Sequence, residues 1–212
     1  MKYDLHVHTH YSGCSSNKPI ELLKTAKKKG LDGIAVVDHG SIKGSMEVAK
    51  LNKDRNFTVL KCMEISSNIG HLLAINISEE IKSKILSEIE DEVRDQDGIL
   101  ILAHPYSIVP FHRIKVPVRA IRESLDGIEA FNPRNGLIGN RKAARIALEN
   151  NIAVTGGSDG HFLFEIGSAY TEFEGNLKKA LKKRETKAKG KIGWGPIGLM
   201  LGEINRVARW RF

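Results

Sequence analysis

The chain alternates short apolar segments, which have the composition of β-strands, with segments of helical periodicity. This alternation restricts the fold more than any other feature, because strands separated by helices pair in parallel. We expect strands at residues 3–8, 33–37, 57–63, 71–75, 98–103, 127–131, 152–155 and 167–173. We expect helices at residues 18–30, near 46–51, at 78–94, at 137–149 and from residue 176.

Six or seven strand–helix units in about 175 residues favour a small (βα) barrel, which is an α/β fold. An open doubly wound sheet is the alternative, and periodicity alone does not separate the two. The open sheet has the weaker case, because no Gly-x-Gly-x-x-Gly sequence follows an expected strand.

The 212 residues are enough for one sizeable domain with its own core. The formal net charge is +8, but residues 176–212 hold 11 Lys and Arg against 2 Asp and Glu, so residues 1–175 are nearly neutral. We therefore expect a barrel with a metal site in residues 1–175 and a basic C-terminal helical extension in residues 176–212. Attraction for nucleic acid or anionic lipid would come mainly from this extension.

Cysteine content and hydropathy favour a cytoplasmic location. Two cysteines, Cys14 and Cys62, are too few for a disulfide framework and suit a reducing compartment. Asp4 and three histidines interrupt the apolar stretch that a signal peptide would need. No apolar run reaches the roughly 20 residues of a transmembrane helix.

The first expected strand places Asp4, His6 and His8 on one face, because side chains alternate along a strand. The two imidazoles are then close enough to bind one cation. A single His-x-His sequence is equally compatible with a pair of hydrogen-bonded polar residues, so the rest of the chain must decide.

Six of the eight histidines lie at or beside the end of an expected strand, together with one glutamate and one aspartate. These residues are His6, His8, His39, His71, His104, His161, Glu64 and Asp159, and all except His71 follow the carboxyl end. Because the carboxyl ends of barrel strands meet on one face, residues spread over 150 positions should converge on one site.

Imidazoles and carboxylates without a thiolate cluster suit Zn, Mn or Fe. The candidates exceed the four ligands of a closed structural zinc site, so we expect two or three divalent ions per chain. Two ions about 3.5–4 Å apart would activate water and stabilise charge during an in-line phosphoryl displacement. Hydrolysis of a phosphate ester is therefore the expected chemistry.

Four short motifs resemble, in the same order, those of the polymerase and histidinol phosphatase (PHP) family. They are Asp4-Leu5-His6-Val7-His8, Val37-Asp38-His39-Gly40, Ala103-His104-Pro105 and Gly157-Ser158-Asp159-Gly160-His161. The resemblance covers residues 1 to about 173. It implies a distorted seven-stranded (βα) barrel, a centre of two or three metals and phosphoesterase activity.

The resemblance also implies the metal ligands, which are His6, His8, His39, Glu64, His104, Asp159 and His161. Glu64 would bridge two ions, and His71 is expected as a further ligand. Many family members have Asp or His after the first motif, where this chain has Gly13 and Cys14. Cys14 therefore either replaces that ligand or is a small buried hydrophobic residue.

The residues expected to take part in catalysis are His6, His8, Glu64, Asp159, His161 and Arg134. Arg134 would hold the substrate phosphate through its guanidinium, unless it is an exposed loop residue, and the same alternatives apply to Arg141. His161 or a water would protonate the leaving group. Asp4 and Asp38 would orient imidazoles, although Asp38 would equally suit a turn cap.

Three further segments lie outside this set. Residues 106–117 are expected to form a loop that would serve as a lid, with His112, like His10, in solvent. The Lys-rich residues 178–191 indicate a solvated helix face or a frayed linker. After residue 194 the apolar positions have helical spacing, and we expect this basic amphipathic helix to dock on the barrel or on a second subunit; anionic lipid and nucleic acid are the alternatives.

The substrate is less well defined than the chemistry. We expect a phosphatase of small phosphomonoesters such as nucleotides or histidinol phosphate, and a 5′ to 3′ exonuclease on short RNA or DNA is the alternative. A metal-free barrel that binds nucleic acid is a third hypothesis, which the near-complete ligand set argues against. A metal-dependent amidohydrolase shares His-x-His and a late Asp, but would usually need a bridging lysine or another ligand order.

Overall fold

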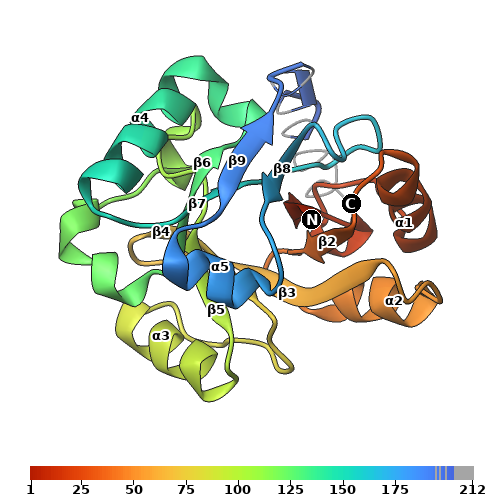
Figure 1. Cartoon of the computed structure of the whole chain (residues 1–212), viewed down its shortest axis with the longest axis horizontal. Coiled ribbons are helices and arrows are strands. Elements are labelled where there is room, and N and C mark those ends of the chain that lie inside the picture. The colour runs from red at the N-terminus through yellow and green to blue at the C-terminus, as the bar shows by residue number, and fades with distance from the viewer. Residues whose placement is uncertain (194, 196, 199, 203–212) are drawn as a thin grey trace.

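A computed structural model describes residues 1–193, 195, 197, 198 and 200–202 of the chain. Nine strands form one sheet in the order β7-β6-β5-β4-β3-β2-β1-β8-β9. The sheet curls into a nearly closed barrel with helices on its outside (Figure 1). The strands are β1 (Lys2–Val7), β2 (Gly33–Val36), β3 (Thr58–Ser67), β4 (Gly70–Ile75), β5 (Ile99–Leu102), β6 (Gly127–Phe131), β7 (Val154–Gly156), β8 (Ala169–Glu172) and β9 (Lys187–Gly190).

Within the described residues, only β4 and β8 run against the other strands, because both pair antiparallel with their neighbours. The expectation of seven parallel strands was therefore wrong in number and in direction. The connection between β3 and β4 is the physical reason for the first reversal. Ser67 pairs with Gly70, so two residues join the strands, and a parallel crossover needs a dozen or more.

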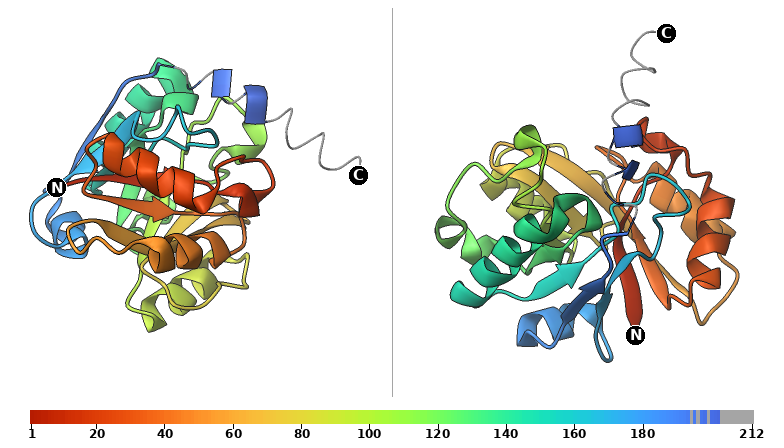
Figure 2. Two further views of the ribbon diagram at one scale, coloured as in Figure 1. Left: turned by 90° about the vertical axis from the view of Figure 1, so that its right-hand side faces the viewer. Right: turned by 90° about the horizontal axis from the view of Figure 1, so that it is seen from above.

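Five α-helices whose full extent lies within the described residues cover the barrel (Figure 2). They are α1 (Pro19–Lys28), α2 (Lys43–Leu51), α3 (Leu86–Asp95), α4 (Gly136–Glu149) and α5 (Leu177–Lys183). The sequence predicted α1 and α4 within one or two residues, but it began α3 eight residues too early. In the structure, Gln96 Oε1 accepts hydrogen bonds from the backbone N–H groups of Ser78 and Glu79. These N–H groups are therefore paired with a side chain and not with the carbonyl groups of a helix.

Five 3-10 helices lie in the connections. They are His10–Ser12, Pro110–His112, Val118–Ala120, Arg122–Ser124 and Pro133–Asn135. In the part of the chain that the structure describes, no helix is long and apolar enough to cross a membrane.

The Lys-rich segment forms α5 and β9 of the barrel, which corrects the expectation of a frayed linker, whereas most of its lysines are exposed, as the solvated helix face predicted. Leu177, Ala180 and Leu181 of α5 are buried in an apolar cluster with β1 and β5. The strand β9 then pairs with β8 along its whole length. Three apolar residues facing inward are sufficient to hold a short helix whose lysines remain in solvent. Most of the expected amphipathic helix after residue 194 lies outside the described residues.

The core positions the rim on which the histidines lie. One apolar cluster includes Leu5 of β1, Leu73 of β4 and Ile101 of β5. Because β1 is separated from both other strands in the sheet, these contacts cross the barrel interior. They fill the barrel interior below its histidines.

Candidate metal centre

The expected site residues come together on one rim of the barrel. His6 belongs to β1, and His39, His104 and His161 follow β2, β5 and β7. His71, which seemed misplaced at the beginning of its strand, lies on the same rim because β4 runs in the opposite direction. Neighbouring imidazoles are close, with the ring centres of His8 and His161 4.3 Å apart.

Eight side chains form four overlapping groups whose ligand atoms lie within 4.8 Å of one another. The groups are His8, His39 and His161; His6, His8 and Glu64; His6, His104 and Asp159; and Glu64, His71 and His104. Because each group shares members with another, the arrangement is suited to several ions rather than one.

The most informative pair is His6 and His8, whose Nε2 atoms lie 3.1 Å apart. The Nδ1 of His6 lies 2.9 Å from Glu129 Oε1. Because a carboxylate only accepts hydrogen bonds, this Nδ1 carries the proton. The Nδ1 of His8 lies 3.0 Å from the Ser12 hydroxyl, which donates its own proton to Asp38. With each Nδ1 acting as the donor, neutral His6 and His8 direct two lone pairs at each other, and a shared cation would satisfy both.

Glu64 lies at the centre of the site and is buried. Its Oε1 contacts His71 Nδ1 at 2.8 Å and His104 Nε2 at 3.0 Å. Its Oε2 has no hydrogen bond, although the nearest imidazole nitrogen, His39 Nδ1, is 3.0 Å away. A buried carboxylate oxygen without a hydrogen bond among imidazoles fits a bridging ligand.

The loop after β7 presents Asp159 and His161. Asp159 Oδ1 is 3.3 Å from His8 Nε2, and the Asp159 carbonyl faces His161 Nδ1 at 2.8 Å. The carbonyl accepts the Nδ1 proton, so the Nε2 of His161 carries the lone pair. Asp159 and His104 both have positive φ, at 52° and 25°. Such strained backbone at two candidate ligands is typical of a functional site.

Electrostatics divide the imidazoles into two kinds. Burial lowers the pKa of His6, but Glu129, Asp159 and Glu64 outweigh it and hold that pKa well above the ordinary value. His39 has its pKa raised in the same way, with Glu64 as the main opposing charge. Burial holds the pKa of His161 well below its usual value, and the nearby Arg134 charge lowers it further.

Cys14 is buried beside this centre but belongs to none of the four ligand groups. Its thiol is free, and it lies close enough to His39 to help raise the pKa of that imidazole. Cys14 therefore lies at the margin of the site, and its role as a ligand stays a prediction.

Sequence reasoning missed Glu129. This buried residue of β6 holds His6 Nδ1 with one oxygen, and its other oxygen accepts the His104 backbone N–H at 2.8 Å. Asn132 also donates to that second oxygen, at 2.9 Å. An acidic residue inside the apolar strand Gly127–Phe131 was the available signal, because a charged side chain is rarely buried without a partner.

Asp4 and Asp38 do not orient imidazoles directly, which corrects that expectation. Asp4 accepts backbone N–H groups, including those of Ser158 and Gly167, and burial raises its pKa to about 6. Asp38 accepts the backbone N–H of Thr9 at 2.7 Å and the hydroxyl of Ser12, so it reaches His8 only through Ser12.

Arg134 is buried rather than exposed, and it forms an ion pair that the sequence did not predict. Its Nε and Nη2 donate to the two carboxylate oxygens of Glu165 at 3.1 and 2.9 Å. Both N–H groups of Nη1 and the second N–H of Nη2 remain for a substrate phosphate. Two glycines of the C-terminal segment lie against this pair. A methyl group at Gly198 would overlap Glu165, and one at Gly202 would lie 3.3 Å from Arg134 Nη1.

The remaining candidates lie at the edge. His112 is not a solvated loop residue, because its ring centre is 4.8 Å from that of His71. Burial lowers the pKa of His112 to about 4, and the nearby His104 and His71 charges add to the effect. The ring of His10 stacks on Tyr11, and Arg141 is exposed on α4.

Fold and site together define an α/β barrel with a rim of imidazoles and carboxylates able to hold several metal ions. Residues 138–186 match the family model PHP_C, described as PHP-associated. Two uncharacterized proteins of Methanocaldococcus jannaschii are similar. MJ1587 is 35% identical over 153 residues, which are 66% of this chain and 88% of that protein. MJ0417 is 33% identical over 188 residues, which are 84% and 73% of the two chains. The chain belongs to the PHP family.

Solved structures share the fold. A two-domain protein from Bacteroides vulgatus, containing a predicted PHP-like metal-dependent phosphoesterase, superposes with a TM-score of 0.72 at 21% identity. The match covers 90% of this chain and 64% of that protein. PsfC from Pseudomonas syringae gives 0.71 at 16% identity and covers 98% of both chains. Endonuclease Q, bound to duplex DNA with an abasic lesion, gives 0.64 at 18% identity and covers 86% of this chain and 56% of that one.

Proposed function

We propose that the protein is a metal-dependent phosphoesterase that hydrolyses small phosphomonoesters, such as a nucleotide or histidinol phosphate. The observation that carries the proposal is the approach of His6 Nε2 and His8 Nε2 to 3.1 Å beside Glu64 Oε2, which has no hydrogen bond. In the metal-free protein a proton on His6 would lie between the two nitrogens, and a bound ion would replace that proton. A cation is the ordinary way to stabilise such an arrangement. Membership of the PHP family makes phosphate esters the first substrates to test.

The residues present fit a centre of two or three divalent ions, of which Zn, Mn and Fe suit the donors best. Those proposed to hold them are His6, His8, His39, Glu64, His71, His104, Asp159 and His161, with Cys14 as a further candidate. When bound, the ions would supply Lewis acidity and an activated water for in-line attack on phosphorus.

The protein's own groups would orient the substrate from the open side of the centre. His6 and His8 are fully buried, whereas the His39 side chain is 36% exposed, so a phosphate would enter past His39. Arg134 Nη1 is the proposed contact for a phosphate oxygen, held in place by the Glu165 pair.

The geometry favours a particular role for His161. Its pKa is held well below the ordinary value, so the imidazole is neutral and its Nε2 is a lone-pair donor. We therefore propose His161 as a metal ligand, and the leaving group would take its proton from water rather than from this side chain.

The exonuclease alternative stays open as a test outcome, since endonuclease Q shows only that the fold accommodates DNA elsewhere. If Lys and Arg contacts to phosphates contribute, activity on oligonucleotides should fall steeply as salt rises. A flat salt response together with turnover of small esters would support the phosphomonoesterase. The cytoplasmic location and an oligomer formed through the C-terminal helix also remain proposals.

The decisive experiment measures bound metal and then assays a panel of phosphomonoesters, bis-phosphorylated nucleotides, oligonucleotides and amides. The His6→Ala/Glu64→Ala double variant should lose metal and turnover while keeping its circular dichroism spectrum. Glu174→Gln is the matched control, because Glu174 is exposed and lies outside the ligand groups. Metal-free protein, or unchanged hydrolysis by the double variant, would refute the proposal.

A further inference from the structure

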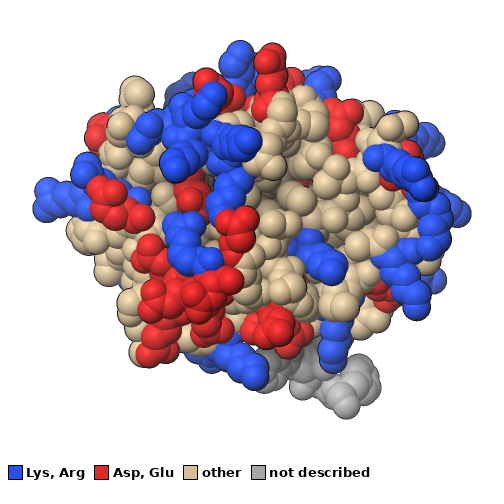
Figure 3. Space-filling view, turned by 60° about the horizontal axis from the view of Figure 1, so that its bottom comes forward, with Lys and Arg blue, Asp and Glu red and all other residues tan. Residues whose placement is uncertain are grey.

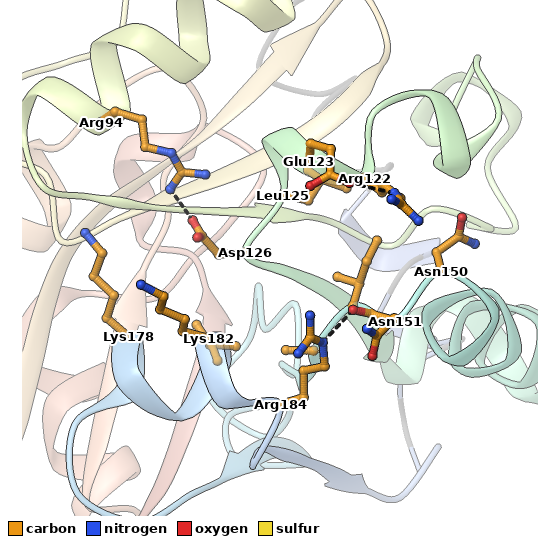
Figure 4. A pocket seen from close by; sticks show the side chains of 13 residues that line it. Arg94, Arg122, Glu123, Leu125, Asp126, Asn150, Asn151, Lys178, Lys182 and Arg184 are labelled. Atoms are coloured by element: carbon orange, nitrogen blue, oxygen red, sulfur yellow. Dashed lines mark hydrogen bonds and ion pairs between the residues drawn. The ribbon is translucent and has the colours of Figure 1, made fainter.

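A pocket of about 520 Å³ lies at the opposite end of the barrel from the metal centre; we call it the basal pocket. Its walls come from the segment before β6, the segment before β7, helix α5 and the end of α3 (Figure 4). Segments that precede parallel strands lie at the amino ends of those strands, so the pocket cannot share a ligand with the rim. Its volume is within the roughly 300–1,000 Å³ of small-molecule sites.

The lining of the basal pocket is strongly basic. Five cations line it, namely Arg94, Arg122, Lys178, Lys182 and Arg184, against two carboxylates, Glu123 and Asp126. Figure 3 shows this end of the molecule, where basic side chains gather beside a group of acidic ones. The net charge of the lining is +3. Three of these cations are paired with carboxylates, Arg94 with Asp126, Arg122 with Glu123 and Lys178 with Asp97, which lies outside the lining. Lys182 and Arg184 are left without a carboxylate partner among the described residues, one cation for each of two phosphoryl groups.

Several of these cations keep donors available. Lys182 has no hydrogen bond or ion pair with the described residues, and it extends over the pocket in Figure 4. Arg184 Nε donates to the Asn151 carbonyl at 2.6 Å, and in the part of the chain that the structure describes its two terminal nitrogens have no carboxylate partner. Arg94 is paired with Asp126, with Nη1 and Oδ2 2.6 Å apart. The unpaired donors therefore lie on the side formed by α5 and the turn before β7.

The backbone fixes this side of the pocket. Arg184 and Asn151 both have positive φ, at 60° and 56°, and the Arg184–Asn151 bond joins these two residues. The bond from Arg184 Nε to the Asn151 carbonyl holds the guanidinium beside the turn that precedes β7. The donors are thus pre-positioned, which lowers the entropic cost of binding an anion.

We propose that the basal pocket binds a small molecule with two linked phosphoryl groups, such as a nucleoside diphosphate. The charge of the lining, its volume and the free donors of Lys182 and Arg184 all match this ligand class. Among the described residues that line the pocket there is no aromatic side chain, so recognition would rest on the phosphates and not on base stacking. The proposal is independent of the metal centre and of the proposed phosphoesterase activity.

A structural role for the same cations is the competing explanation. Lys182 lies in the last turn of α5 and Arg94 in the last turn of α3, where positive charge stabilises the helix dipole. That role predicts that the charge variants, measured without ligand, unfold at a lower temperature than the wild type. It also predicts that they bind the ligand as tightly as the wild type does. Lys183 occupies the same last turn of α5 but does not line the pocket, so it separates the two explanations.

The test is titration calorimetry of the full chain with inorganic diphosphate and with a nucleoside diphosphate. The Lys182→Gln/Arg184→Gln variant should bind either probe about tenfold more weakly or worse, and Lys183→Gln should bind like the wild type. Hydrogen exchange should show diphosphate-dependent protection at residues 150–153 and 178–184. Comparison of the two probes tells whether the nucleoside adds affinity.

Three results would overturn the proposal. The first is equal weakening by Lys183→Gln, which would indicate general surface charge. The second is protection confined to the rim residues, which would assign the binding to the metal centre. The third is that Lys182→Gln/Arg184→Gln loses affinity for a 5′-phosphorylated oligonucleotide but keeps its affinity for both diphosphate probes, which would make this surface a nucleic-acid contact.

Discussion

Glu129 Oε1 lies 2.9 Å from His6 Nδ1 while Oε2 of the same carboxylate accepts the backbone N–H of His104. One side chain of β6 therefore fixes a ligand candidate on β1 and the start of the loop after β5. Since carboxylates that hold metal-binding imidazoles also set their tautomer, this contact decides which nitrogen of His6 faces the centre.

Glu129→Gln should weaken metal binding or activity about 10–100-fold. The amide of Gln has one acceptor oxygen, whereas His6, His104 and Asn132 all donate to the carboxylate, so its NH₂ group must face a donor. Metal content by mass spectrometry and kcat/KM would measure the effect. Glu174→Gln is again the control, and equal values in both variants would exclude a positioning role for Glu129.

Gly157→Ala should impair the site through packing alone. A methyl group there would overlap His6 Cβ and come within 2.9 Å of Glu129 Oε1. We expect a loss of about 1–3 kcal/mol in the free energy of unfolding and a larger relative loss of activity. Gly127→Ala is the matched control, because its methyl group would meet neighbours at the ordinary distance of 3.4 Å. Wild-type activity in Gly157→Ala would contradict the packing of His6 described above.

The ion pair of Arg134 and Glu165 should show strong coupling in a double-mutant cycle. Both side chains are buried, so removal of either leaves the other charged and unpaired, at a cost of about 3–5 kcal/mol. Arg134→Ala/Glu165→Ala should lose much less than the sum of the single variants, measured by urea unfolding. Additive losses would show that the two charges do not depend on each other.

The sequence predicted the convergence of the histidines because each follows a strand, and strand order determines which ends meet. Residues 66–70 have the composition of a turn, but the hairpin of β3 and β4 was not predicted, because the apolar runs on both sides suit parallel strands equally well. For the same reason His71 looked out of place until the strand direction was known.

The supporting residues were harder to predict than the ligands. Glu129 and Glu165 contact the site from positions 123 and 31 residues away from their partners, and neither belongs to a short motif. Residues 187–190 were expected in the extension because lysines predominate there. In the structure they form an edge strand, which is held by backbone hydrogen bonds to β8 and has Ala188 as its one partly buried residue. Composition does not report such backbone pairing.

Metal binding should release protons at pH 7. In the metal-free protein the pKa values of His6 and His39 are raised well above 6.5 by neighbouring carboxylates, so these imidazoles are protonated at pH 7 and must lose a proton to bind an ion. His161, whose pKa is lowered, is already neutral and contributes none.

The sign of the pH dependence follows from these directions. Apparent affinity for Zn or Mn should rise with pH until the raised pKa values of His6 and His39 are passed, and then level off. Calorimetric titrations in two buffers of different ionisation enthalpy give the number of protons released directly. We expect at least one per chain at pH 7 and fewer in Glu129→Gln, because loss of that carboxylate charge lowers the pKa of His6. Proton uptake, or equal release in both proteins, would contradict the assigned electrostatics of His6.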